Sequence, residues 1–208
     1  GNLFNAPETY MNKIATAKTE KGVVDLDYSI KKNITNLAEY KNVSPSDLSA
    51  CILDRPRHKK IIDELKKLKV NLYLITDGDV SGALLVSKPA YKIDIFLGIG
   101  GGPEGVLAAA ALDTYGCNFQ GRFLFDKDKD IREAKKSGIS DLNKKYELNE
   151  IIKGDSIFCA TAITDCLPIS KSLKEKSEFI SSLKGIKNKN DLFITETIVT
   201  HKSSKKEG

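Results

Sequence analysis

The segment IDIFLGIGGGPEGVLAAAALDTYG, residues 93–116, predicts a buried strand, a glycine loop and a helix in immediate succession. Residues 93–97 are mostly apolar, which is typical of a parallel strand covered on both faces. Four of the residues 98–102 are glycines, so their amide groups can converge on a bound group. Pro103 suits a first helical position, and the alanine-rich run 106–112 continues the helix.

A glycine loop at a helix N-terminus favours an anion, because unpaired amides and the positive end of the helix dipole both face the ligand. Phosphate is the first candidate. Glu104 lies in the first turn, where its carboxylate would repel a bare phosphate unless a divalent cation lies between them or the side chain turns away. The alternative is that Glu104 is only a favourable acidic residue at a helix start.

Composition indicates a globular protein of one large or two small domains, with 208 residues of which 40% are hydrophobic. The sequence has no apolar run near the roughly 20 residues of a membrane span and no signal peptide, so we expect a cytoplasmic protein. The net charge of +5 comes from scattered lysines. No basic stripe is interleaved with aromatic residues, so we expect neither nucleic-acid nor membrane partners. The basic tail, 201–208, is expected to be disordered.

The four cysteines form no C-x-x-C pair, and Cys51 and Cys159 lie in apolar runs typical of strands. We therefore expect reduced core residues. With only two histidines, a zinc site of mixed ligands is disfavoured. Any metal should be a hard ion held by oxygen, such as magnesium or manganese.

The remaining pattern alternates strands with helices, which indicates an α/β fold with a mostly parallel sheet. The final β-rich run is expected to add an antiparallel edge, and the stretch 167–183 is ambiguous. The expected strands are 50–53, 71–75, 93–97, 122–125, 156–163 and 192–200, and the expected helices are 29–42, 56–68, 79–86, 103–112 and 130–137, with a short element of uncertain type at 146–152.

Parallel strands share one carboxyl edge, so the segments 54–58, 77–79 and 98–105 should face one crevice. Arg55 and Arg57 carry planar, permanently charged groups suited to phosphate oxygens. The aspartates of segment 77–79 can accept hydrogen bonds from sugar hydroxyls. We therefore predict a site for a phosphorylated polyol at this edge of the sheet.

Each motif also has a plainer interpretation. The Arg-Pro-Arg-His run at 55–58 can be solvent-facing charge at a helix start, and Asp-Gly-Asp at 77–79 can be an ordinary turn. His58 has no partner that the sequence identifies, so it is interpreted as a surface or helix-start residue. The occurrence of these motifs at three aligned strand ends favours the binding site.

A dinucleotide-binding oxidoreductase is an alternative, because residues 100–105 satisfy G-x-G-x-x-G and Asp126 ends the next expected strand. Three observations weaken it. Glu104 is an awkward neighbour for a pyrophosphate, the motif lies in a later βα unit, and the charged residues at 55–57 and 77–79 are left without a role.

Six segments occur along nearly the whole sequence in the order APETYMNKIA, ILDRPRHKKII, LITDGDVSGALL, DIFLGIGGGPEGVLAAAAL, QGRFLF and TETIVTHK. In this order and spacing they resemble the class II fructose-1,6-bisphosphatases, metal-dependent bacterial enzymes that in some lineages also hydrolyse sedoheptulose 1,7-bisphosphate. The glycine-loop segment carries the most diagnostic part of the resemblance.

This resemblance implies a layered α/β sandwich related to the lithium-sensitive sugar and inositol phosphatases, with a substrate cleft between two halves. It also implies that Glu104 is a metal ligand. The substrate contacts that it implies are Tyr10, Arg55, Pro56, Arg57, Asp77, Gly78, Asp79 and Gly101.

The sequence departs from the family in two respects. The other metal-binding acids and the groups near the attacking water lie, in the family, in an N-terminal segment of roughly a hundred residues that this sequence does not contain. Gly102 replaces the usual alanine. We therefore interpret residues 1–200 as the C-terminal, substrate-binding portion, inactive without the missing N-terminal half, or alternatively as a noncatalytic sugar-phosphate-binding protein.

The reaction implied by the resemblance is hydrolysis of the 1-phosphate of fructose 1,6-bisphosphate, a step of gluconeogenesis that yields fructose 6-phosphate and phosphate. Manganese or magnesium is the implied cofactor. A homo-oligomer is also expected.

Overall fold

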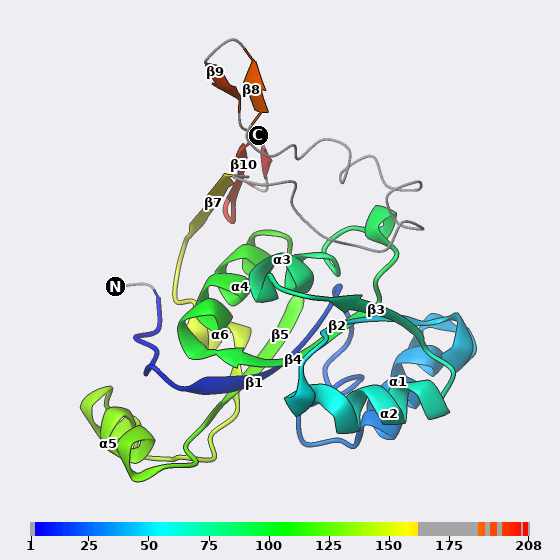
Figure 1. Cartoon of the computed structure of the whole chain (residues 1–208), viewed down its shortest axis with the longest axis horizontal. Helices are drawn as coiled ribbons and strands as arrows, with labels where there is room; N and C mark the ends of the chain where they lie inside the picture. Colours follow the sequence, from blue (N-terminus) through cyan, green and yellow to red (C-terminus); the bar gives the residue numbers. More distant parts are fainter. Residues whose placement is uncertain (1–2, 162–186, 190–191, 195–196, 205, 208) are drawn as a thin grey trace.

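The computed structural model describes residues 3–161, 187–189, 192–194, 197–204 and 206–207. A six-stranded sheet in the order β3-β2-β4-β1-β5-β6 forms its centre (Figure 1). The strands are β1 (Tyr10–Thr16), β2 (Ser49–Leu53), β3 (Asn71–Ile75), β4 (Ile95–Gly101), β5 (Asn118–Leu124) and β6 (Tyr146–Glu147).

Four of the six strands, β2, β3, β4 and β5, point in the same direction, which confirms the expectation of a mostly parallel sheet. β2 pairs in parallel with both β3 and β4. β1 runs antiparallel between β4 and β5, and β6 runs antiparallel to β5. The sheet is therefore a parallel block, β3-β2-β4, that continues into antiparallel pairs.

The central strand β1 was not predicted as a strand. Its sequence, YMNKIAT, places Asn12 and Lys13 within an otherwise apolar run, which obscures the pattern of a buried strand. Each of its residues nevertheless faces a partner on both sides, with Tyr10 opposite Gly101 of β4 and Leu124 of β5. β1 thus fixes how β4 and β5 lie relative to each other.

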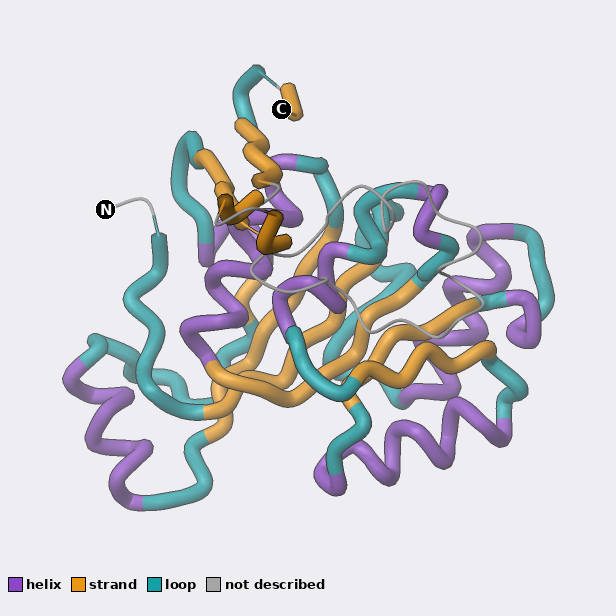
Figure 2. The backbone as a smooth tube through the Cα atoms, turned by 45° about the horizontal axis from the view of Figure 1, so that its top comes forward, coloured by secondary structure: helices purple, strands orange, loops and turns teal. Residues whose placement is uncertain are grey.

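Helices cover both faces of the sheet and give three layers, α/β/α (Figure 2). The pair α1 and α2 packs on one face through Ile34, Leu37 and Leu65. The other face carries α4, whose residues 108–112 are all buried together with Phe96 and Phe119 of the sheet. The helices are α1 (Ile30–Lys41), α2 (Lys59–Lys67), α3 (Asp79–Leu84), α4 (Gly102–Thr114), α5 (Asp128–Lys136) and α6 (Leu148–Ile151).

Local sequence determines where several of these helices begin and end. The Ser29 hydroxyl caps α1 by accepting the N–H of Lys32 at 3.1 Å, and Asn42 ends the helix in the left-handed conformation. Pro103 lies in the first turn of α4. Gly78, with φ of 87°, makes the turn into α3. No helix in the described part of the chain combines the length and apolar character that a membrane span requires.

The C-terminal region differs from the expected antiparallel edge. β7 (Ile157–Thr161), β10 (Thr197–His201) and β11 (Lys206–Glu207) form a separate three-stranded sheet, and β8 (Lys187–Lys189) pairs only with β9 (Leu192–Ile194). The tail from 201 was expected to be disordered, yet His201 pairs with Lys206 in its described residues. A buried hydrogen bond of 2.7 Å from Thr114 to Thr200 joins this sheet to α4. The ambiguous stretch 167–183 lies outside the described residues.

The cysteine expectation is only partly confirmed. Cys51 and Cys117 are buried, and burial raises the pKa of each thiol to about 12, so both are unreactive at neutral pH. Cys159 is exposed on β7 instead of buried in the core, because β7 lies in the small second sheet. Cys166 lies outside the described residues.

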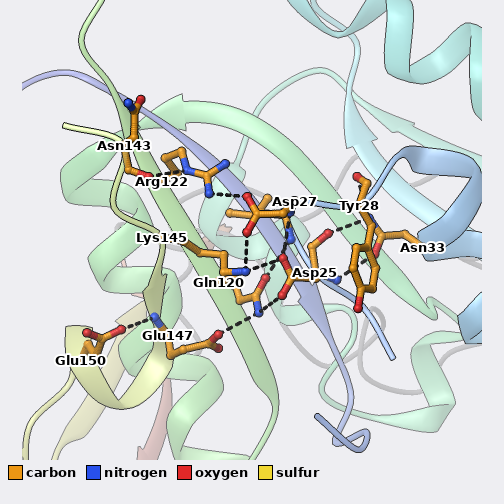
Figure 3. Close-up of polar contacts among 11 residues, drawn as sticks. Asp25, Asp27, Tyr28, Asn33, Gln120, Arg122, Asn143, Lys145, Glu147 and Glu150 are labelled. Carbon is orange, nitrogen blue, oxygen red and sulfur yellow. Dashed lines mark hydrogen bonds and ion pairs between the residues drawn. The ribbon is translucent and has the colours of Figure 1, made fainter. Parts of the chain in front are cut away.

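A polar network ties the segment before α1 to β5 and to the segment before β6 (Figure 3). Asp27 accepts from Arg122 at 2.5 Å and from Lys145 at 2.7 Å, and Lys145 also pairs with Asp25. The Gln120 amide donates to Glu147 at 2.9 Å. The network holds together three segments that are far apart in sequence, so its role is structural.

Candidate functional site

The carboxyl ends of β2, β3 and β4 lie at one edge of the sheet, as the sequence predicted, because these three strands are parallel neighbours. The backbone N–H of Asp54 donates to the carbonyl of Ile75 at 2.8 Å, which joins the segments that follow β2 and β3. The segments 54–58 and 77–79 and the start of α4 therefore meet at this edge.

Tyr10 and Arg57 come together from distant parts of the chain. The Arg57 guanidinium lies 5.1 Å from the centre of the Tyr10 ring, and its Nε donates to the carbonyl of Ile99 at 2.6 Å. Both side chains are exposed at the sheet edge. Since Tyr10 also faces Gly101 across the β1–β4 pair, three of the predicted substrate contacts form one cluster.

Glu104 lies against Gly101. Its carboxylate occupies the space that a side chain at Gly101 would take, so Gly101 allows a close approach. The glycines up to Gly101 extend β4 instead of forming the predicted loop, because β1 pairs with them. The N–H of Gly102 donates to the carbonyl of Thr9 at 2.7 Å. This end of the helix is therefore not the open phosphate cradle that the glycine pattern predicted.

A hollow of about 590 Å³ adjoins this cluster. Tyr10, Gly101 and Glu104 line one part of it, and further carboxylates, among them Asp126 and Asp130, line another. Such a hollow is large enough for a sugar phosphate. Its acidic lining favours a bound cation or a ligand that carries one.

Beneath the cluster, Lys13 of β1 forms an ion pair with Asp79 at the start of α3. Lys13 is completely buried, and Asp79 is 12% exposed. Burial lowers the pKa of Lys13, and the Asp79 carboxylate opposes this shift. Glu104 and Arg57 also act on the Lys13 charge, so Lys13 lies among three of the predicted site residues.

Sequence reasoning did not identify Lys13, although a signal was present. Met11, Lys13 and Ala15 alternate along β1, so a lysine shares one strand face with two apolar residues. All three are buried on the side of the sheet that α4 covers. A buried lysine requires a partner, which here is Asp79.

His58 is the N-cap residue of α2, so its interpretation as a helix-start residue is confirmed, but it is buried and is not a surface residue. Its Nε2 accepts the backbone N–H of Ile99 at 2.8 Å, and its Nδ1 lies 2.7 Å from the carbonyl of Leu53. Nδ1 therefore carries the proton of a neutral ring. Burial lowers the pKa of His58 from its ordinary value of 6.5. The imidazole bridges the ends of β2 and β4 and is a structural residue.

The remaining predicted contacts lie at the same edge of the sheet. Arg55 and Pro56 begin the 3₁₀ turn Pro56–His58 and are exposed. The Asp77 carboxylate accepts the N–H of Gly78 at 2.9 Å, as in an ordinary turn. Asp77 is exposed, so it remains available to a ligand.

Glu104 is a single candidate metal ligand. In the described part of the chain, no group of three or more histidine, cysteine, aspartate or glutamate side chains is placed to hold a metal ion. Magnesium often takes one or two protein carboxylates and completes its shell with phosphate and water. Glu104 therefore fits one position of such a site, and further ligands have to come from elsewhere.

The sheet topology disfavours the dinucleotide alternative. In a dinucleotide-binding βαβ unit, the strand after the helix lies parallel to the strand before it in the same sheet. The acidic residue at the end of that second strand contacts the ribose. Here the antiparallel strand β1 separates β4 from β5, which Asp126 follows. The Glu104 carboxylate also lies against Gly101, where a pyrophosphate would have to bind.

Fold and site together define an α/β protein that presents basic, acidic and glycine groups at the carboxyl ends of parallel strands, an arrangement suited to phosphorylated small molecules. The model of the bacterial fructose-1,6-bisphosphatases, described as glpX-encoded, matches residues 1–207. The chain belongs to this family.

Curated relatives agree with this assignment. Two are named D-fructose 1,6-bisphosphatase class 2/sedoheptulose 1,7-bisphosphatase. The protein of Prochlorococcus marinus (strain NATL1A) is 35% identical over 181 residues, which are 80% of this chain and 54% of the relative. That of Synechococcus sp. (strain JA-2-3B'a(2-13)) is 38% identical over 178 residues, which are 79% of this chain and 51% of the relative. The chain thus spans about half the length of the curated relatives it matches.

Proposed function

We propose that this chain is the substrate-binding part of a fructose-1,6-bisphosphatase that hydrolyses the 1-phosphate to give fructose 6-phosphate and phosphate. The observation that carries the proposal is the cluster of Tyr10, Arg57, Gly101 and Glu104, which come from three separate segments. The names of the relatives support the substrate class. Fructose and sedoheptulose bisphosphates both carry the phosphates and sugar hydroxyls that such a site would recognise.

In this proposal the chain's own residues bind and orient the substrate. Arg57 is held by the Ile99 carbonyl and by the Tyr10 ring, and it is exposed, so its remaining N–H groups are accessible to a phosphate. Asp77 and Asp79 accept hydrogen bonds from sugar hydroxyls. Fixing both ends of the sugar holds the reacting phosphate in place and lowers the entropic part of the barrier.

Glu104 would hold one divalent cation, manganese or magnesium. When bound, the cation supplies charge stabilisation at the phosphate and lowers the pKa of a water molecule. Because one carboxylate does not complete a site, we propose that the remaining ligands belong to the part of the relatives that this chain does not match. The intact enzyme is then a larger assembly, which we expect to be a cytoplasmic homo-oligomer.

Calorimetric titration tests this proposal. The chain is titrated with fructose 1,6-bisphosphate and with NAD, each with and without manganese. We expect the sugar bisphosphate to bind and Arg57→Ala to abolish its binding, whereas the matched exposed variant Lys60→Ala should leave it unchanged. If NAD binds and fructose 1,6-bisphosphate does not, the proposal is contradicted and the dinucleotide alternative is favoured for the glycine segment.

The noncatalytic alternative needs a second measurement. Phosphate release from fructose 1,6-bisphosphate is assayed with manganese, first with this chain alone and then with the unmatched half of a relative supplied separately. Release that requires both parts supports a catalytic role for the chain. Sugar binding without release under either condition favours a noncatalytic sugar-phosphate-binding protein.

A further inference from the structure

Two glycines of the 100–105 segment make room for one lysine side chain. A side chain added at Gly100 would lie 3.2 Å from Lys13 Nζ, and one added at Gly105 would lie 3.1 Å from Lys13 Cε. The Lys13 side chain therefore passes beneath the junction of β4 and α4, between these two glycines. This packing accounts for two of the three glycines of the G-x-G-x-x-G pattern, and the third, Gly102, lies against Phe123 and the Thr9 carbonyl instead.

The same side chain determines where Asp79 lies. Lys13 pairs with Asp79 Oδ2, and a side chain at Gly100 would come within 2.6 Å of this oxygen. The other oxygen, Oδ1, is buried and has no hydrogen-bond partner among the described residues. An unsatisfied buried carboxylate oxygen is costly, so it is an acceptor that a ligand hydroxyl or a water would satisfy.

Lys13 also lies near the site's other charges. The Glu104 carboxylate raises and the Arg57 guanidinium lowers the pKa of Lys13, and both of these residues are exposed. The buried Lys13 ammonium thus lies close to three residues with proposed roles. Asp79 is proposed to contact the sugar, Glu104 to hold the metal and Arg57 to bind a phosphate.

We propose that Lys13 is a positioning residue of this site, which holds the Asp79 carboxylate through Oδ2 in the orientation in which this carboxylate accepts a sugar hydroxyl. The part that concerns the sugar rests on the proposed function. The part that concerns the position of Asp79 does not.

The ligand-free test is amide hydrogen exchange on the whole chain. Lys13→Met keeps the length of the side chain and removes its charge. We expect exchange to accelerate by about tenfold or more in the first turns of α3 and α4, because a hydrogen bond to a charged group is worth at least that factor. The core of α1 should be unchanged, and the exposed control Lys60→Met should show no effect. Unchanged exchange in α3, or uniform acceleration throughout the sheet, would overturn the positioning role.

The ligand test compares fructose 1,6-bisphosphate with 1,6-hexanediol bisphosphate, which lacks the sugar hydroxyls. Lys13→Met should raise the dissociation constant of the sugar by about tenfold and change that of the diol little. In an Asp79→Asn background, Lys13→Met should have little further effect on the sugar, since the two residues act as a unit. The double variant carries no unpaired buried charge, so it also controls for misfolding.

Equal losses for both ligands, or additive losses in the double variant, would overturn the role of Lys13 in sugar recognition. Failure of the unmodified chain to bind the sugar would instead contradict the proposed function and its sugar-specific part. Hydrogen exchange would still decide whether Lys13 positions Asp79.

Discussion

The His58 ring accepts the backbone N–H of Ile99 through Nε2 at 2.8 Å. Nδ1 of the same ring faces the Leu53 carbonyl at 2.7 Å, so a neutral ring satisfies one group on each of two parallel strands. A protonated ring cannot accept the Ile99 N–H. The alignment of the ends of β2 and β4, on which the candidate site depends, therefore depends on a neutral histidine.

The first prediction concerns stability against pH. Burial lowers the pKa of His58 in the folded state below its ordinary 6.5, so the unfolded chain binds the proton more readily. The contribution of His58 is complete above about pH 6.5 and is lost as the pH falls through the folded pKa, with a slope of at most about 1.4 kcal/mol per pH unit. Urea unfolding between pH 8 and pH 5 measures it.

The control for this prediction is His58→Gln, whose amide supplies one donor and one acceptor without titrating. This variant should lack the part of the pH dependence that His58 causes. An identical loss of stability in both proteins over this pH range would contradict the assignment.

The second prediction concerns the Met11 thioether, which lies between α4 and β5. A side chain at either Gly105 or Gly121 would overlap the Met11 sulfur. Gly105→Ala should destabilise the fold by about 1–3 kcal/mol through overpacking, and Met11→Ala by about 2–5 kcal/mol through a cavity. The double variant should be more stable than the sum of the two effects by about 1 kcal/mol or more, because the new methyl group enters the space that methionine leaves.

Denaturant unfolding of the four proteins in this cycle tests the prediction. The exposed Leu107→Ala on the same helix should change stability by no more than about 0.5 kcal/mol. Additive effects of the two core substitutions would show that Gly105 and Met11 contribute to stability independently.

Sequence prediction succeeded for elements that local patterns determine and failed for the strand whose position depends on long-range pairing. Ile34, Leu37 and Ala38 of α1 form a periodic face, and Ser29 and Asn42 flank it, so local signals were sufficient for this helix. The run 71–75 is β3 as predicted. The insertion of β1 between β4 and β5 joins segments about a hundred residues apart, and no local periodicity records such a pairing.

The site shows the same division. The charged residues at 55–57 and 77–79 follow strands that local patterns identify, so the sequence was sufficient to bring them to one edge. The pairing of Lys13 with Asp79 depends on β1, and the missed strand hid it. The glycines 98–101 favour a loop by conformational freedom alone, but pairing with β1 makes them part of a strand.

The third prediction concerns Asp27 in the polar network. Hydrogen bonds from Lys145 and Arg122 lower its pKa from 3.8 to about 2. Its contribution to stability is therefore complete above about pH 3.8 and is lost as the pH falls through about 2. The Asp27 side chain is 52% exposed, so solvent screening limits the effect. Asp27→Asn should cost less than about 1 kcal/mol at pH 7.

Thermal unfolding at pH 7 and at pH 2 checks this prediction, and the difference between Asp27→Asn and the unmodified chain should shrink at the lower pH. It should also shrink in 1 M salt. Glu39→Gln, an exposed acid on α1, is the matched control. A difference that persists at pH 2 would mean that Asp27 acts by packing instead of charge.

The last prediction concerns Glu104 as a metal ligand. Glu104→Gln keeps the shape of the side chain against Gly101 but removes the charge that a hard cation requires. In the intact enzyme, we expect at least a tenfold higher manganese concentration for half-maximal activity and lower turnover. Affinity for the sugar bisphosphate without metal should change little, since Arg57 and Tyr10 remain. Asp126→Asn, in the same hollow, is the comparison. Unchanged manganese dependence and turnover in Glu104→Gln would exclude Glu104 as a ligand and leave it as an acidic residue at a helix start.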